Sequence, residues 1–420
     1  MREKLKELSQ NKFLRNVSTL AFGTIISQAI VVLSSPLLTR IFTVEDFGVL
    51  QIFTSITVFF AVISTGRYEL AIGLPKEDDD ALRIIKLIIF IGFAISTLYF
   101  ITIFILKFFF KYEDYTRFLV GNNAYVAPIY IFFIAIFSAL SYWNQRKKKY
   151  KLITYSNAIQ VISATFFSIL FGFLGFHDGM IWSLVIGIIV ACFYILIKEN
   201  LVLVIWNQKN NLLALAKVYK SFPRYMIFSD LSLTASQQFI PLIFSVLYSN
   251  TIVGLYSLAN RMLRLPNIVL TSSIANVFRN DAIDEIRNKG NCEELYISTF
   301  KKLIFMSLPI YILVFIFSPK IFVLIFGVKW EMAGYFARVL STMLLFEFVA
   351  TPLNTIFYVR EKQKIFMRLQ VLNAIIGGIL IYLGYNLFND ALYSLILFSA
   401  GSIIFNLILL FKSYTIAKNV

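Results

Sequence analysis

The sequence predicts an all-α integral membrane protein with about twelve transmembrane helices in two six-helix halves, and with both termini in the cytoplasm. Three observations carry this prediction: twelve apolar stretches, an alternation of positive charge between their joints, and an internal repeat. A helix rises 1.5 Å per residue, so about 20 apolar residues span a hydrocarbon core of about 30 Å. The chain is 59% hydrophobic and 15% charged, which leaves little of its 420 residues for a soluble domain.

The first half contains six predicted spans, separated by joints that alternate between basic and nearly free of positive charge. A basic segment precedes the first span, and a joint with Lys76, Arg83 and Lys86 follows the second. The run 146–151 (RKKKYK) follows the fourth span, and the longest polar joint, about 198–224, follows the sixth. The six predicted spans are 14–39, 48–72, 84–110, 119–142, 156–175 and 180–197.

The second half repeats the alternation. Basic joints follow the eighth span (279–302), the tenth span (360–368) and the twelfth span (412–418). Residues 279–290 (RNDAIDEIRNKG) predict an amphipathic extension of the eighth helix. The six predicted spans are 225–247, 252–278, 303–319, 335–358, 366–386 and 391–411.

The distribution of positive charge predicts the orientation. With the N-terminus in the cytoplasm, 29 of the 39 Lys and Arg residues fall on the cytoplasmic side, six on the opposite side and four within spans. Such a positive-inside bias is typical of multi-pass membrane proteins. It also accounts for the net charge of +16, so no nucleic-acid partner is expected. The basic joints would hold anionic membrane lipids near the cytoplasmic side.

Short matches at fixed offsets indicate that the two halves are copies of one six-helix unit. Because six is even, both copies would enter the membrane from the same side, an arrangement that transporters use. We therefore expect an N-terminal lobe over 1–206, a cytoplasmic linker over 207–224 and a C-terminal lobe over 225–420. The matching segments are 41–43 with 247–249, 47–49 with 253–255, 118–121 with 324–327, and 157–159 with 373–375.

The residues that bind metals and many cofactors are scarce. Cys192 lies within a span and Cys292 lies in a joint, so the two are not expected to pair, and their spacing matches no metal motif. The chain has a single histidine. We expect no metal site and no cofactor.

The eighth span carries the strongest polar signal. Asn260, Arg264 and Asn267 follow an i, i+4, i+7 spacing and share one helix face, and Arg261 is an i, i+3 neighbour of Arg264. A charge within the hydrocarbon costs about 2.5–3.5 kcal/mol, so such residues usually face a cavity or a partner. We interpret these residues as lining a cavity. The alternative is an arginine paired with a carboxylate for stability alone.

Other polar residues extend this candidate site. Arg67 ends the second span, where it contacts a ligand or extends to the headgroups, and Glu69 could hold it in place. Asp230 could pair with Arg261 or Arg264, or bind a coupling ion. The remaining candidates are Glu347, a structural partner or proton site on the tenth span, the cavity-lining Gln237 and Gln238, and Arg338, which we expect to reach the outer headgroups.

At these residues the chain resembles lipid-linked oligosaccharide flippases, the translocases of O-antigen and related polysaccharides in the multidrug/oligosaccharidyl-lipid/polysaccharide (MOP) exporter superfamily. The resemblance covers nearly the whole chain, through segments such as TGRYELAIGLPKEDDDA and VGLYSLANRMLRLPNIVL. The positions that match the family pattern are Arg40, Asp46, Gly48, Gly66, Arg67, Tyr68, Glu69, Pro75, Gly254, Tyr256, Asn260, Arg261, Pro266 and Trp330.

The resemblance implies a MOP/MATE-like transporter fold in the bacterial inner membrane and no enzyme activity. The implied cargo is a polyprenyl-diphosphate-linked oligosaccharide, an O-antigen, capsule or exopolysaccharide repeat unit. It would move from the cytoplasmic to the outer leaflet by alternating access. The diphosphate would meet Arg264, Arg261, Asn260 and Arg67 in a central cavity. Antiport of H⁺ or Na⁺ would use Asp230, Glu69 or Glu347, and a polysaccharide polymerase is an implied partner.

Two other functions remain open at this point. A small-molecule or drug antiporter of the same superfamily is the nearer one, although cationic drugs would favour an acidic cavity over arginines. A membrane polysaccharide polymerase or ligase is more remote. Such an enzyme needs an active site on the outer face, whereas the predicted outer joints are short and hold no acid/base cluster.

Overall fold

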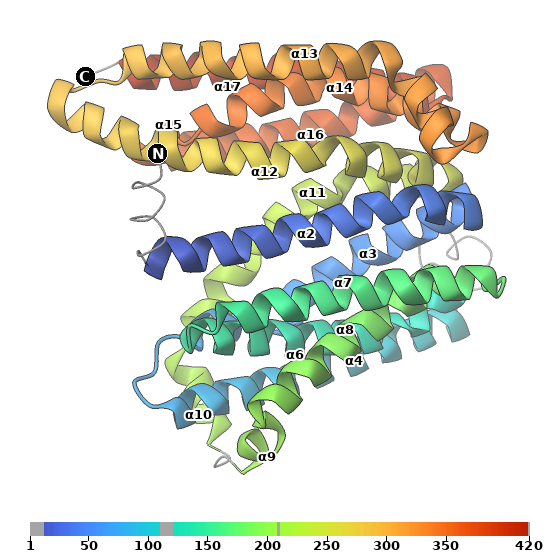
Figure 1. The fold of residues 1–420 in the computed structure, drawn as a ribbon, viewed down its shortest axis with the longest axis vertical. Helices are drawn as coiled ribbons and strands as arrows, with labels where there is room; N and C mark the ends of the chain where they lie inside the picture. Colours follow the sequence, from blue (N-terminus) through green and yellow to red (C-terminus); the bar gives the residue numbers. More distant parts are fainter. Residues whose placement is uncertain (1–11, 110–120, 208–210, 419–420) are drawn as a thin grey trace. The chain divides into compact units, whose positions relative to one another are not determined.

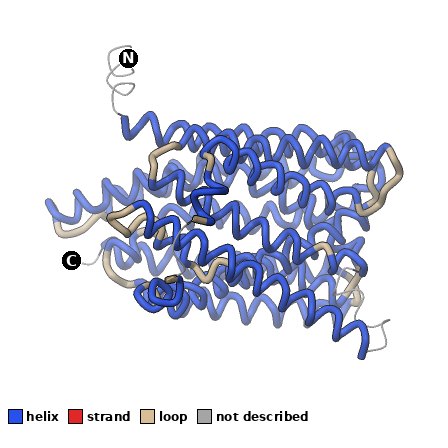
Figure 2. The backbone as a smooth tube through the Cα atoms, turned by 90° about the horizontal axis from the view of Figure 1, so that it is seen from below, coloured by secondary structure: helices blue, strands red, loops and turns tan. Residues whose placement is uncertain are grey.

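The structure, a computed structural model, describes residues 12–109, 121–207 and 211–418, and this part of the chain contains helices and no strand (Figure 2). The long helices are α2 (Lys12–Ile41), α3 (Val44–Ser64), α4 (Asp78–Phe109), α6 (Ala127–Arg146), α7 (Tyr150–Phe173), α8 (Gly179–Glu199), α11 (Ile227–Leu247), α12 (Asn250–Lys289), α13 (Glu293–Phe326), α14 (Glu331–Leu353), α16 (Gln363–Phe388) and α17 (Ala391–Lys418). The short elements are η1 (Tyr68–Ala71), η2 (Gly121–Tyr125), α9 (Leu201–Trp206), α10 (Leu212–Val218), the π-turn η3 (Phe222–Met226), η4 (Val328–Trp330) and α15 (Ile356–Val359).

Each predicted span corresponds to one long helix in the described residues. Nine of these helices are long and apolar enough to cross a membrane. Among the described residues, α2 and α11 contribute the shorter apolar stretches Ile25–Ile41 and Gln238–Leu247. The predicted polar residues Asp230, Arg261 and Arg264 lie on α11 and α12.

The chain divides into two compact units, Met1–Leu242 and Ile243–Val420, with the boundary inside α11. In the first unit α7 packs against α2 and α8, while α6 packs against α3, α4 and α8 (Figure 1). The contact between α7 and α8 depends on Gly187, because a Cβ there would lie 2.7 Å from the Gln160 carbonyl oxygen. Small residues let helix backbones approach closely in this way.

In the second unit α14 is central, because it packs against α12, α13 and α17 (Figure 1). The α13–α14 contact is formed at Pro319 and Gly334, where a Cβ on Gly334 would lie 2.5 Å from the Cα of Pro319. Pro319 has no N–H, so the Phe315 carbonyl four residues earlier loses its helical donor. Arg338 supplies the missing hydrogen bond, Nε to the Phe315 oxygen at 2.9 Å. The predicted headgroup-facing Arg338 thus also stabilises α13.

The internal repeat reappears as matching helix boundaries. The helix α2 ends at Ile41, and α11 ends 206 residues later at Leu247. The next helices begin with equivalent hydroxyl caps: Thr43 accepts a hydrogen bond from the Asp46 N–H at 3.2 Å, and Ser249 accepts one from the Ile252 N–H at 3.4 Å. A side-chain oxygen at this position pairs an amide that has no partner within the helix.

Three predicted boundaries are wrong. The helix of the tenth span, α14, ends at Leu353 rather than at residue 358, and the short helix α15 follows. The second span ends at Ser64 rather than at residue 72, because Gly66 and Arg67 adopt left-handed backbone angles (φ 57° and 58°) that no α-helix continues through. The helix of the fourth span begins at Ala127 rather than at 119, with Pro128 in its first turn. Residues 119 and 120 lie outside the described residues. The predicted extension of the eighth helix is confirmed as part of α12, which continues to Lys289 and ends at Gly290.

Candidate functional site

Arg67 occupies a turn between helices in the first unit. The left-handed angles of Gly66 and Arg67 end α3, and η1 follows immediately. The Arg67 N–H also donates to the Thr65 hydroxyl at 3.2 Å. The turn therefore directs the arginine by backbone geometry that a continuous helix could not provide, since a non-glycine residue rarely adopts a positive φ.

Arg67 joins two carboxylates into one cluster. Its Nη1 donates to Glu69 Oε1 at 2.8 Å, and its Nε and Nη2 both donate to Asp230 Oδ2 on α11. Glu69 is only 1% exposed, and its second oxygen, Oε2, has no hydrogen-bond partner among the described residues. One guanidinium thus faces two carboxylates, which gives this cluster a formal charge of −1.

This geometry confirms the predicted Arg67–Glu69 contact and gives Asp230 a partner that was not predicted. Asp230 pairs with Arg67 within the first unit. The sequence could not indicate this, because Arg67 and Asp230 are 163 residues apart and only the packing of η1 against η3, the π-turn that leads into α11, brings them together. No metal-ligand spacing or short motif links them.

A second polar group in the first unit involves Gln238, a predicted cavity residue. The fully buried Ser55 hydroxyl on α3 donates to Gln238 Oε1 at 2.8 Å. Gln51, one turn earlier on α3, donates to Ser55 at 3.1 Å. Gln51 and Ser55 were not among the predicted site residues, although their i, i+4 spacing in an apolar helix indicates one polar face. The side chain of Gln237 lies outside the described residues.

The second unit holds the predicted arginine cluster on α12. Arg264 Nη1 and Nη2 donate to the two oxygens of Glu347 on α14, at 2.6 and 3.2 Å. Arg264 Nε donates to Asn260 Oδ1 at 2.8 Å, across the predicted i, i+4 spacing. Such a two-pronged contact fixes the plane of the guanidinium. The structure therefore brings together Asn260, Arg264 and Glu347, and places Glu347 as the counter-ion of Arg264.

Asn267 lies three residues beyond Arg264 and is 6% exposed. Its side-chain oxygen accepts a short hydrogen bond from the hydroxyl of Tyr311 on α13, while its Nδ2 has no partner among the described residues. Tyr311 is itself buried and lies within Coulombic range of Arg264 and Glu347. Tyr311 was not predicted, because a tyrosine in an apolar helix gives no sign of where its hydroxyl will meet a partner.

Arg261 differs from the other two arginines. It is half-buried on α12, and within the described part of the second unit no ion pair or hydrogen bond involves its side chain. Arg261 and Arg264 together with the single acid Glu347 give the second unit a cluster with a formal charge of +1. The two units thus carry half-buried charge clusters of opposite formal sign.

A metal centre is not visible in this geometry. Within the ranges that the structure describes, no group of three or more His, Cys, Asp and Glu side chains lies together. Cys192 and Cys292 are both buried and free, and belong to different units.

Comparison with known proteins gives one family and one fold. A family model described as "Polysaccharide biosynthesis protein" matches residues 37–335, more than two thirds of the chain. No curated protein matches the chain. Three solved structures that share its fold are a multidrug resistance MATE family transporter of the MOP superfamily in an inward-facing conformation, the lipid II flippase MurJ in an inward closed conformation, and a MOP superfamily transporter from Pyrococcus furiosus.

The MATE transporter has a TM-score of 0.70 at 12% identity, covering 92% of this chain and 94% of the other. MurJ has a TM-score of 0.69 at 15% identity, covering 94% and 89%. The Pyrococcus furiosus transporter has a TM-score of 0.55 at 11% identity, covering 96% of each chain. This protein is therefore a multi-pass membrane protein with the fold of MOP transporters, and its structural neighbours are transporters and flippases rather than enzymes.

Proposed function

The chain belongs to the family of polysaccharide biosynthesis proteins, and we propose that it is a flippase for a polyprenyl-diphosphate-linked oligosaccharide. The cargo would be an O-antigen, capsule or exopolysaccharide repeat unit. It would pass from the cytoplasmic to the outer leaflet of the bacterial inner membrane by alternating access through an arginine-containing cavity. The observation that carries this proposal is the excess positive charge of the α12 cluster, in a family whose members serve polysaccharide biosynthesis.

Arg261 is the side chain best suited to meet the diphosphate first. A guanidinium within a membrane span that has no counter-ion is costly, and an anion that binds it removes much of that cost. Its planar array of donors matches the oxygens of a phosphate in pairs. Because no described carboxylate of the second unit neutralises Arg261, the cargo need not displace a partner from that unit.

Arg264 would bind the diphosphate by exchanging its ion-pair partner Glu347 for the cargo. Its guanidinium is held by Glu347 and Asn260, so it is preorganised but neutralised in this structure. A diphosphate next to Arg261 would compete with Glu347 for Arg264. The diphosphate would then bind both Arg261 and Arg264, which lie one helical turn apart. Because this interaction forms only when cargo is bound, it can drive a change of conformation.

The cluster of Arg67, Glu69 and Asp230 would bind a cation rather than an anion. With two carboxylates on one arginine, and with Glu69 Oε2 unpaired, it would be stabilised by one further positive charge. We therefore place the coupling ion, H⁺ or Na⁺, at Glu69 and Asp230, and treat Glu347 as the structural acid. A polysaccharide polymerase would receive the translocated cargo as a partner.

An antiporter of small cationic drugs would share this fold. A cation that approaches α12 would meet the net positive charge of Arg261 and Arg264, which opposes its binding. The cluster on α12 therefore favours an anionic cargo over a cationic one.

The test is the sidedness of a lipid-linked oligosaccharide in proteoliposomes, measured with an impermeant probe of the sugar. We expect protein-dependent translocation in the wild type and a loss of at least about tenfold in Arg261→Ala, because a charge-assisted contact contributes about 1.5–3 kcal/mol. Arg338→Ala, which alters an arginine outside the cluster, is the matched control. Wild-type protein that moves no cargo under either an H⁺ or a Na⁺ gradient would contradict the proposal, and drug efflux would then be measured.

A further inference from the structure

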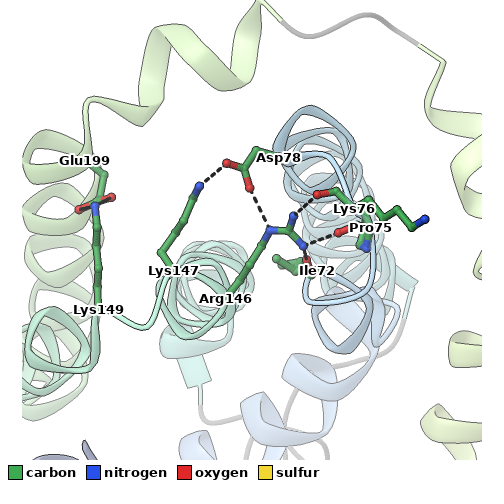
Figure 3. A network of polar contacts seen from close by, with 8 residues as sticks. All are labelled: Ile72, Pro75, Lys76, Asp78, Arg146, Lys147, Lys149 and Glu199. Atoms are coloured by element: carbon green, nitrogen blue, oxygen red, sulfur yellow. Dashed lines mark hydrogen bonds and ion pairs between the residues drawn. The ribbon is translucent and has the colours of Figure 1, made fainter. Parts of the chain in front are cut away.

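Arg146, the last residue of α6, holds the chain segment that follows Arg67 (Figure 3). Its Nη1 donates to the carbonyl oxygens of Pro75 at 2.7 Å and Ile72 at 3.2 Å, and its Nη2 donates to the Lys76 oxygen at 3.2 Å. Its Nε donates to the carboxylate of Asp78, the first residue of α4, at 3.1 Å. The arginine side chain is only 12% exposed. One guanidinium thus forms hydrogen bonds with four residues of segment 72–78.

Segment 72–78 is connected to Arg67 by a series of backbone turns. The Leu70 N–H donates to the Arg67 oxygen, the Ile72 N–H to the Glu69 oxygen, and the Leu74 N–H to the Ala71 oxygen, at 3.0–3.4 Å. Ile72 therefore donates to Glu69 through its N–H and accepts from Arg146 through its carbonyl. Each turn depends on the next, so a constraint on Ile72 also constrains the backbone of Glu69.

The same helix reaches the Arg67 cluster one turn earlier. The phenol of Tyr142, four residues before Arg146, lies within Coulombic range of Glu69, Arg67 and Asp230. Residues four apart lie on one face of a helix. One face of α6 thus meets both the charge cluster and the segment that follows it.

We propose that Arg146 is a positioning residue for the Arg67–Glu69–Asp230 cluster. It fixes the carbonyls of segment 72–76, which fix the η1 turn, which directs Arg67 and Glu69 toward Asp230. This role rests on the proposed flippase function for its effect on transport, and on geometry alone for its effect on the turn. Arg146 belongs to the basic run 146–151, whose positive charge is predicted to orient the helices in the membrane. The proposal gives this residue a second, geometric role.

Lysine cannot take over this task. A guanidinium presents five donors in a planar fork, whereas an ammonium offers three donors from one point. The substitution Arg146→Lys keeps the positive charge that orients the helices but loses the simultaneous contacts with three carbonyls and a carboxylate. It therefore separates the geometric role from the charge role.

The chain offers a matched control at the same end of the helices. Lys149 pairs with Glu199 at the end of α8, at 2.5 Å, and no contact joins it to the described residues 72–78 (Figure 3). Lys149→Ala removes one positive charge and one ion pair without touching the turn. Lys147, which shares Asp78 with Arg146, is unsuitable as a control.

The first measurement is hydrogen–deuterium exchange of the amides of Leu70, Ile72 and Leu74 in the full-length protein in detergent. We expect exchange at least about tenfold faster in Arg146→Ala and Arg146→Lys than in the wild type, and unchanged exchange in Lys149→Ala. Unchanged exchange in both Arg146 variants would overturn the proposal. This arm does not depend on any cargo.

The second measurement is translocation of the lipid-linked oligosaccharide in proteoliposomes. We expect Arg146→Lys to lose about tenfold or more, because a displaced binding group lowers the rate steeply. The Arg146→Lys/Arg67→Ala variant should be no slower than Arg67→Ala alone. An additive loss in that variant, or full activity in Arg146→Lys, would overturn the positioning role. If the wild type moves no cargo, the flippase proposal fails, and the exchange data still decide whether Arg146 holds the turn.

Discussion

Arg264 on α12 and Glu347 on α14 form a two-pronged ion pair, with nitrogen–oxygen distances of 2.6 and 3.2 Å. The side chains are 35% and 29% exposed, so each is largely removed from solvent. Asn260 completes the contacts of the arginine. Because α14 is the central helix of the second unit, this pair links the candidate site to the packing of that unit, and its variants will affect stability as well as transport.

Removal of Arg264 should destabilise the protein more than removal of the whole pair. Arg264→Ala leaves the carboxylate of Glu347 without its partner, and we expect a loss of about 2 kcal/mol in the free energy of unfolding. The Arg264→Ala/Glu347→Gln variant should recover part of that loss, because it leaves no unpaired charge. Thermal unfolding in detergent measures both. Additive effects of the two substitutions would contradict the pairing.

Arg261 and Arg264 should separate in their effects on stability and transport. Arg261→Ala removes no internal ion pair among the described residues, so its melting temperature should stay within about 2 °C of the wild type while translocation is lost. Arg264→Lys should recover only part of the wild-type rate, since an ammonium cannot make the same two-pronged contact. Purified variants are compared in unfolding and proteoliposome assays. Normal translocation by Arg261→Ala would remove it from the cargo site.

Arg338 should become dispensable once Pro319 is replaced. Arg338→Ala leaves the Phe315 carbonyl without a donor, at a cost of about 1 kcal/mol. Pro319→Ala restores a backbone N–H four residues after Phe315, so the Arg338→Ala/Pro319→Ala variant should unfold at a higher temperature than Arg338→Ala. A double variant less stable than both single variants would show that the arginine does not act through this carbonyl.

Cys292 should resist thiol reagents in the folded protein. Burial raises the pKa of the Cys292 thiol to about 11, so almost none of it is thiolate near neutral pH. Maleimide labelling at pH 7 should require unfolding, and its rate should rise as the pH approaches 11. The unfolded chain loses this proton first, near pH 9, so the free energy of unfolding should fall between pH 9 and 11. Fast labelling of the folded Cys292→Ala variant would instead locate reactivity at Cys192.

Helix content and helix order were predictable because they depend on local composition. Apolar length identified the spans, and repeated hydroxyl caps at Thr43 and Ser249 mark the same boundary in both halves. The end of α3 was not predictable. Apolar residues continue past Ser64, whereas the helix stops at the left-handed Gly66 and Arg67, a backbone choice stabilised by contacts with α6 and α11.

The candidate residues were predictable as a set, and their partners were not. A charged residue within an apolar stretch can be recognised from the sequence alone. The free-energy cost of placing a charge in the hydrocarbon therefore identified Arg67, Asp230, Arg264 and Glu347 as candidates. Which charged side chains form ion pairs depends on which helix faces pack together, and the number of possible pairings grows with the number of helices. The pairing of Asp230 with Arg67 was therefore not predicted, while Asn260 and Arg264, which helical periodicity places on one face, are in contact.

The sequence by itself determined that this protein is helical, crosses the membrane many times and places several charged residues within its apolar stretches. Each of these properties follows from composition and spacing along the chain. Only the tertiary structure decided that Arg67 pairs with two carboxylates, that Glu347 neutralises Arg264, and that Arg146 binds the backbone of the segment that follows Arg67. Ion pairs and carbonyl contacts act over about 3 Å, and packing alone brings residues that lie more than 60 positions apart within that distance.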